Sequence, residues 1–147
     1  DLATERQILL ATTGATEGKV QNIFSTEELL TAQAVLRRMP VGEDIMESIL
    51  ELVRAFRPDE PDASDHVRQT VAWGPGPRAS QALMLTVRAR ALLHGRLVPD
   101  ASDVIAMAKP VLKHRMALNF AALARGESLD SLIEAEIVKN ARLKDAA

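Results

Sequence analysis

Residues 43–56 read EDIMESILELVRAF and carry the clearest pattern in the chain. Apolar side chains recur there every three or four positions, at Ile45, Ile49, Leu52, Val53 and Phe56. This spacing puts them on one face of a helix, and most of the charged residues between them fall on the opposite face. The stretch therefore predicts an amphipathic helix that packs on a core.

The residues before this stretch predict two more helices. Asp1 is suited to cap a first helix, and Gly14 is placed to end it in the left-handed conformation. Its apolar side would be formed by Leu2, Ile8 and Leu9. Ser25 and Glu28 form a capping box that opens a second helix, which Pro40 stops.

Three helices are expected after residue 76. Pro77 fits the first turn of a helix that runs to Gly95. Asp100 begins another, with a kink at Pro110 and an end at Gly126. A last helix would be capped by Ser128 and followed by a polar tail.

Residues 58–76 are rich in Pro, Gly and Asp, and predict one long loop. No segment longer than three or four residues alternates as a strand does. The predicted fold class is all-α, a helical bundle. The length of 147 residues suits a single compact domain.

The composition predicts a cytoplasmic protein. There is no cysteine, no apolar run long enough to span a bilayer, and no signal peptide at the acidic start. The abrupt start on a helix cap is typical of a piece excised from a longer protein.

Charge divides the chain into two parts. Residues 1–65 carry 6 basic and 13 acidic side chains, and residues 75–115 carry 7 basic against 2 acidic. The second stretch is either a solvated basic face or a surface that meets an anion.

The residues do not form a complete active site. The three histidines lack metal-ligand spacing and no cysteine accompanies them, so no metal site is predicted. The phosphate-binding pattern Gly-x-x-x-x-Gly-Lys-Ser/Thr is absent. On its own the chain is expected to need no cofactor and to have no activity.

Residues 74–80, GPGPRAS, place Arg78 in the first turn of a helix. The helix dipole disfavours a cation there, so the arginine is better explained if a phosphate shares the site with it and the backbone amides. An ordinary exposed arginine after a proline-rich turn fits the sequence equally well.

Three stretches resemble the lid domain of MoxR-type AAA+ ATPases. Residues 74–79, GPGPRA, are similar to the family's Gly-x-Ser-Pro-Arg-Ala signature, with Gly76 where serine is usual. Residues 98–104, VPDASDV, are similar to its Val-x-Pro-x-Asp-Val helix entry with one extra residue, and residues 111–115, VLKHR, match its Val-Leu-x-His-Arg motif. The resemblance covers nearly the whole chain.

The resemblance implies a division of the chain and a site. Residues 1–24 would lead in from an AAA+ core, 25–126 would form the main lid bundle, and 127–147 the last helix and tail. Arg78 would be the sensor 2 arginine of the intact enzyme, with Gly76, Pro77, Arg78 and Ala79 near the ATP phosphates. His114 and Arg115 are expected to bond within the lid or to the core.

The resemblance also implies ATP with magnesium in the intact enzyme and chaperone-like remodelling of other proteins. The expected partners are the AAA+ core of the same chain, neighbouring subunits of a ring, and proteins with von Willebrand A domains. Two alternatives stay open at this point: a helical DNA-binding module that uses the basic residues up to Arg115, and a stand-alone protein-binding bundle. Nucleic acid is disfavoured by the acidic first half and the few aromatic side chains.

Overall fold

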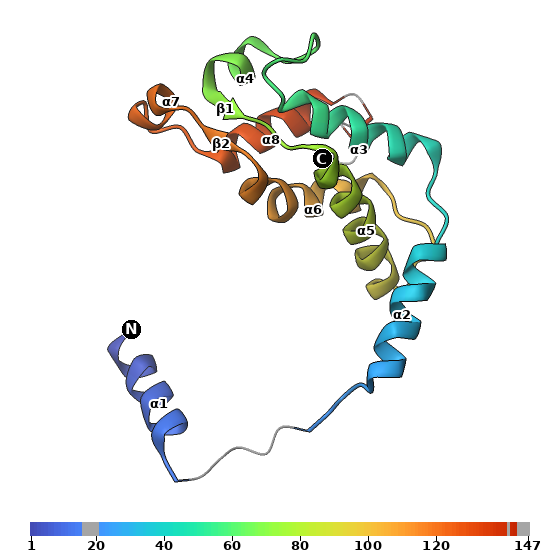
Figure 1. Cartoon of the computed structure of the whole chain (residues 1–147), viewed down its shortest axis with the longest axis vertical. Helices are drawn as coiled ribbons and strands as arrows, with labels where there is room; N and C mark the ends of the chain where they lie inside the picture. Colours follow the sequence, from blue (N-terminus) through green and yellow to red (C-terminus); the bar gives the residue numbers. More distant parts are fainter. Residues whose placement is uncertain (16–20, 141, 144–147) are drawn as a thin grey trace. The chain divides into compact units, whose positions relative to one another are not determined.

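The computed structural model describes residues 1–15, 21–140 and 142–143. Eight α-helices, one 3-10 turn and two short strands follow one another in these residues, so the all-α class is confirmed. In chain order they are α1 (Leu2–Thr13), α2 (Thr26–Arg38), α3 (Glu43–Ala55), α4 (Asp65–Thr70), β1 (Val71–Trp73), α5 (Pro77–Leu93), α6 (Ala101–Leu112), η1 (Lys113–Arg115), β2 (Ala117–Leu118), α7 (Phe120–Ala124) and α8 (Leu129–Lys139) (Figure 1). None of these helices is long and apolar enough to cross a bilayer.

The chain divides into two compact units, Asp1–Ala32 and Gln33–Ala147. In the first unit both expected caps are confirmed: the Thr4 amide donates to Asp1 at 2.8 Å, and the Ser25 amide donates to Glu28 at 2.7 Å. The left-handed end at Gly14 is wrong, because this residue is extended with φ −77°. The expected connector between these helices lies partly at residues 16–20, outside the described residues.

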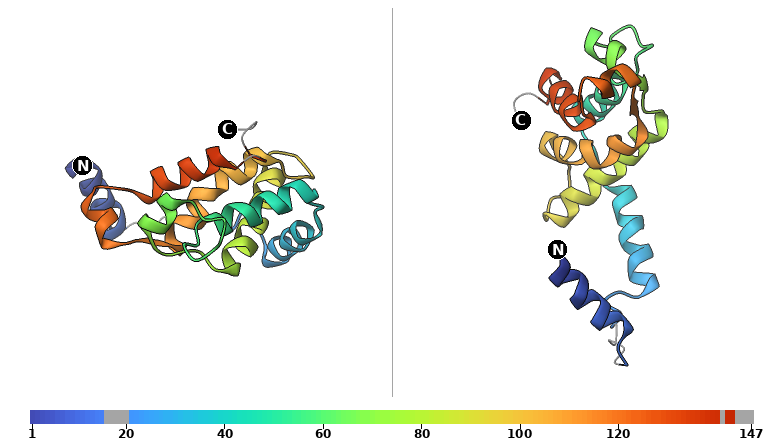
Figure 2. Two further views of the ribbon diagram at one scale, coloured as in Figure 1. Left: turned by 90° about the horizontal axis from the view of Figure 1, so that it is seen from above. Right: turned by 90° about the vertical axis from the view of Figure 1, so that its left-hand side faces the viewer.

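The core of the second unit forms where α3, α5 and α6 pack on one another, with α8 packed on α3 and α6 (Figures 1 and 2). The core contains the apolar face predicted for residues 43–56, together with buried apolar side chains of the other helices. Its fully buried members include Leu52, Val53, Phe56, Leu83, Val87, Val104, Leu112, Leu132 and Ile133. The predicted amphipathic helix is therefore confirmed.

Local signals also place the ends of the later helices correctly. Pro77 occupies the first turn of α5, and Asp100 with Asp103 forms a capping box at the start of α6. Gly95 and Gly126 are left-handed, with φ of 73° and 75°, a conformation that favours glycine after a helix.

The prediction of one long loop over residues 58–76 is wrong for its second half, which contains a helix and a strand. Ser64 caps the six-residue helix α4, accepting from the Val67 amide at 3.3 Å. Strand β1 follows and pairs antiparallel with β2, with Val71 opposite Leu118. A helix of six residues spans fewer than two turns, too few for a repeating apolar spacing to show in the sequence. Strand β1 is stabilised by a partner far along the chain.

The prediction of one kinked helix from Asp100 to Gly126 is also wrong, because several shorter elements occupy this range. Helix α6 accommodates Pro110 and ends at Leu112; η1, β2 and α7 follow in place of a continuous helix. Met116 is extended and buried, which turns the chain toward β2. The buried, extended Met116 thus lies where the predicted helix would have continued, and no glycine stands at this point of the sequence to indicate the change.

The polar tail predicted after α8 contains a core residue. Leu143 is fully buried, and Arg142 donates to Glu51 on α3 at 2.9 Å. These contacts hold the end of the described chain on the bundle. Residues 141 and 144–147 of the expected tail lie outside the described residues.

Candidate site at the start of helix α5

A hollow of about 660 Å³ lies at the N-terminus of α5. It brings together the four residues predicted for the phosphate site and two from the η1 turn. Its lining consists of Trp73, Gly74, Gly76, Pro77, Arg78, Ala79, His114 and Arg115. None of these eight residues is acidic, so the hollow carries positive charge without an internal counter-charge.

Close packing against the two residues that follow α3 fixes the backbone that leads to Arg78. A Cβ atom on Gly74 would lie 2.3 Å from the Phe56 carbonyl oxygen, so only glycine fits this approach. Arg57 donates from Nε to the Pro75 carbonyl at 2.8 Å. Ala79 is buried in the core. The first turn of α5 is thus anchored on both sides of Arg78, whose own side chain is exposed.

Gly74→Ala is expected to destabilise the chain by about 1–3 kcal/mol, because the new methyl group would overlap backbone atoms that cannot move independently. Urea unfolding followed by circular dichroism measures the change. Gly76→Ala is the matched control: Gly76 has φ −81°, and a Cβ atom placed there would have no neighbour within 4 Å. Equal stability of the two variants would contradict the close approach at Gly74.

Arg78 and Arg115 have no carboxylate partner within ion-pair distance in the part of the chain that the structure describes. Arg115 is half-buried and donates from Nη1 to the Val111 carbonyl at 2.7 Å, and it contacts His114 Nε2. His114 and Arg115 were expected to bond within the lid or to the core, and these two contacts lie within the lid. They leave the charge of Arg115 unneutralised.

Most other basic residues of the 75–115 stretch are neutralised. Arg90 and Arg96 both bind Asp103, at 2.5 and 2.7 Å. Lys113 binds Asp130 at 2.5 Å, and Lys109 binds Glu134. A broad solvated basic face therefore does not form. Among the described residues of this stretch, Arg78 and Arg115 in the hollow and Arg88 farther along α5 are the cations without a carboxylate partner.

Asp103 is the centre of a buried ion cluster that sequence reasoning identified only as a helix start. Its side chain is fully buried and accepts hydrogen bonds from Arg96, the Asp100 amide and Arg90. Burial raises the pKa of Asp103, but these hydrogen bonds outweigh that effect and lower it to about 2. The cluster fixes the second half of α5 to the start of α6.

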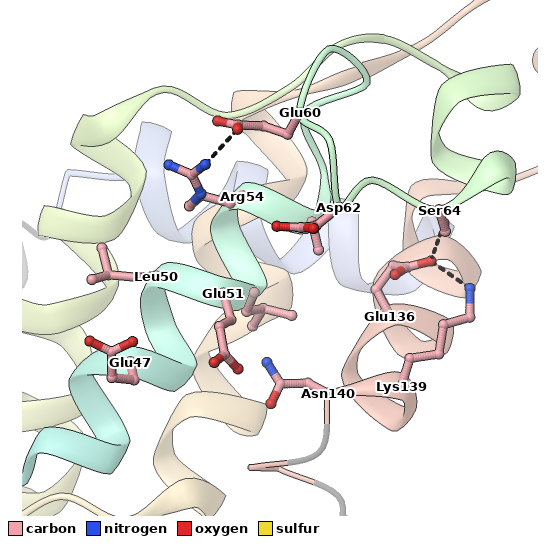
Figure 3. A pocket seen from close by; sticks show the side chains of 12 residues that line it. Glu47, Leu50, Glu51, Arg54, Glu60, Asp62, Ser64, Glu136, Lys139 and Asn140 are labelled. Carbon is pink, nitrogen blue, oxygen red and sulfur yellow. Dashed lines mark hydrogen bonds and ion pairs between the residues drawn. The ribbon is translucent and has the colours of Figure 1, made fainter.

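A second hollow, of about 530 Å³, lies between α3, α8 and the segment before α4 (Figure 3). Its lining includes five carboxylates and only two cations: Glu47, Glu51, Glu60, Asp62 and Glu136 with Arg54 and Lys139. Several are already paired, Arg54 with Glu60 at 2.5 Å and Lys139 with Glu136 at 2.7 Å. The excess negative charge would repel a phosphate. A further hollow is lined by Lys109 and Lys113, but both lysines are paired with carboxylates, so the α5 hollow is the better candidate site.

Within residues 1–15, 21–140 and 142–143, no three His, Asp or Glu side chains come together in a way that could hold a metal ion. The residues that line the α5 hollow can bind an anion through guanidinium groups and helix amides.

The AAA lid domain family matches residues 63–136, half of the chain, and this match includes the whole α5 hollow. The chain therefore belongs to the AAA lid domain family. It is 33% identical to the chaperone MoxR1 of Mycobacterium tuberculosis over 143 residues, which are 97% of this chain and 36% of that protein.

Two further proteins are similar. An uncharacterised protein of Bacillus subtilis, YeaC, is 28% identical over 116 residues, which are 78% of this chain and 33% of YeaC. A crystal structure of a candidate ATPase from Cytophaga hutchinsonii superposes with a TM-score of 0.78 at 25% identity, over 95% of this chain and 42% of that one. The chain thus spans about a third of the length of the curated relatives it matches.

Proposed function

We propose that this domain is the lid of a MoxR-type AAA+ ATPase and that Arg78 is its sensor 2 arginine. In this mechanism the lid closes over ATP held by a nucleotide-binding core, and nucleotide state moves the lid relative to the core. The observation that carries the proposal is the placement of Arg78, which is exposed in a hollow without carboxylates on a rigidly held first helical turn.

The residues of the hollow fit the phosphate part of a nucleotide. A guanidinium group binds phosphate oxygens with two parallel hydrogen bonds, and the positive end of α5 adds to the attraction. Gly76, Pro77 and Ala79 would shape the approach beside Arg78. The chain supplies no phosphate loop, and the hollow has no carboxylate for magnesium, so both ATP and the ion would be held by the core.

Exposed apolar side chains on α1 support a contact with such a core. Leu2, Ile8, Leu9 and Leu10 are each more than half exposed. Apolar side chains gathered on one exposed helix are typical of a surface that another domain covers. We propose the AAA+ core of the same chain as that partner.

At the level of the assembly, we propose a cytoplasmic ring in which neighbouring subunits contact one another and remodel proteins with von Willebrand A domains. The similarity to a chaperone supports the remodelling role.

The DNA-binding alternative is less well supported. A duplex contact needs several unpaired cations along one face, whereas Arg90, Arg96, Lys109 and Lys113 are paired with carboxylates. A stand-alone protein-binding bundle would leave the unpaired charge of Arg78 unexplained. Hydrolysis measured on Arg78 variants distinguishes this alternative from the lid.

The chain by itself is expected neither to hydrolyse ATP nor to bind it tightly, because one or two arginines and a helix end cannot replace a phosphate loop and a magnesium site. Titration calorimetry and a phosphate-release assay with magnesium present measure both properties. Micromolar affinity, or turnover above a protein-free blank, would contradict the proposed role as a lid.

A further inference from the structure

We infer that Arg115 is a second phosphate-binding residue of the α5 hollow, so that the lid offers two guanidinium groups to neighbouring phosphates of one ligand. The inference rests on the proposed function and extends it. It assigns the chemical class of the ligand as a chain of at least two linked phosphates.

The presence of Arg115 and Arg78 in the lining of one hollow points to a shared ligand. Arg78 comes from the start of α5 and Arg115 from the η1 turn after α6, yet both line the same hollow. No acidic side chain lines the space that they share. Two cations around one hollow repel each other unless an anion lies between them.

The way Arg115 is held also suits a phosphate. Its Nη1 atom donates to the Val111 carbonyl at the end of α6, which orients the planar group. In the described part of the chain no hydrogen bond occupies its Nε or Nη2 atoms. A guanidinium that is fixed by one nitrogen and has others available is prepared to bind a phosphate.

The arginines of the Asp103 cluster show what a purely structural role looks like in the same domain. Arg90 and Arg96 are neutralised by one buried carboxylate that joins two helices. Arg115 forms no ion pair of this kind. Its hydrogen bond to the Val111 carbonyl explains how the side chain is oriented, but it does not explain why a second positive charge without a carboxylate partner lines the same hollow as Arg78.

Steady-state ATP hydrolysis by the complete ATPase chain tests the inference, with Arg115→Gln, Arg115→Lys and Lys113→Gln compared. Glutamine keeps an N–H donor and lacks the charge, although its side chain is two bonds shorter than that of arginine. We expect Arg115→Gln to lower kcat/KM about tenfold and to raise the inhibition constant of inorganic triphosphate by a similar factor. Arg115→Lys should recover part of both losses.

Lys113→Gln is the matched control, because Lys113 belongs to the same turn, is paired with Asp130 and does not line the hollow. It should change neither constant more than twofold. The thermal midpoint of Arg115→Gln should stay at the wild-type value; a lowered midpoint with unchanged triphosphate inhibition would assign Arg115 a structural role and overturn the inference.

Arg78→Ala, measured in parallel, separates the role of Arg115 from the proposed function. Slow hydrolysis in Arg78→Ala with wild-type constants in Arg115→Gln would overturn the role of Arg115 and leave the proposed function standing. Wild-type hydrolysis in both variants would overturn the two together.

Discussion

Replacing Arg78 by alanine in the complete ATPase is expected to slow ATP hydrolysis about 10- to 10³-fold while nucleotide binding is largely retained. A guanidinium between lid and phosphate contributes most when negative charge shifts during transfer, and so acts mainly on the transition state. Arginine fingers contribute roughly 10³ to 10⁵ in rate, and Arg78 shares its hollow with other positive groups, so a smaller effect is expected. Steady-state turnover and labelled-nucleotide binding measure the two quantities.

Arg78→Lys should restore only part of the rate, because an ammonium keeps the charge but loses the planar fork. Arg88→Ala is the control, since Arg88 lies farther along α5 and does not line the hollow. Its turnover should stay close to that of the wild type. Equal damage from Arg88→Ala, or wild-type turnover in Arg78→Ala, would place the nucleotide contact elsewhere.

Asp103→Asn is expected to lower the free energy of unfolding of the chain by about 3 kcal/mol. The substitution removes the charge that neutralises Arg90 and Arg96, and breaking a buried ion pair from one side costs about 3–5 kcal/mol. The lower end applies because both arginines are partly exposed, with 29% and 33% of their side chains accessible. Urea unfolding at pH 7 measures the change.

Asp130→Asn is the matched control, because its pair with Lys113 is exposed on both sides. Such surface pairs contribute about 0–1 kcal/mol. A loss at Asp130 as large as that at Asp103 would contradict the central role of the buried cluster.

The same cluster predicts a pH dependence. The pKa of Asp103 is about 2 in the folded chain, against an ordinary value of 3.8. A lowered carboxyl pKa stabilises the fold above the ordinary value, and this stabilisation, about 2 kcal/mol, is lost as the pH falls from about 4 toward 2. The difference in unfolding free energy between wild type and Asp103→Asn should therefore narrow from pH 7 to pH 3; a constant difference would contradict the lowered pKa.

Features set by neighbouring residues were predictable from the sequence. The caps at Asp1, Ser25 and Asp100 depend on hydrogen bonds between residues two or three positions apart. The apolar face of residues 43–56 follows from the regular three- or four-residue spacing of its side chains. The start of α5 at Pro77 placed Arg78 in its first turn for the same reason.

Features set by distant residues were not predictable. Strand β1 depends on β2, whose residues lie more than forty positions farther along the chain. The partners of Asp103 come from another helix and the α5–α6 connection. The position of Arg115 in the α5 hollow likewise depends on where α6 ends, and no local pattern in the sequence indicates that end.

In the proposed lid, the start of α5 meets the phosphates of a bound nucleotide. This contact would be visible in a crystal structure of the complete ATPase with magnesium and a non-hydrolysable ATP analogue. We expect a nitrogen of the Arg78 guanidinium within about 2.7–3.2 Å of a phosphate oxygen. A bound analogue whose phosphates lie away from the α5 hollow, with Arg78 exposed to solvent in the closed enzyme, would contradict the claim.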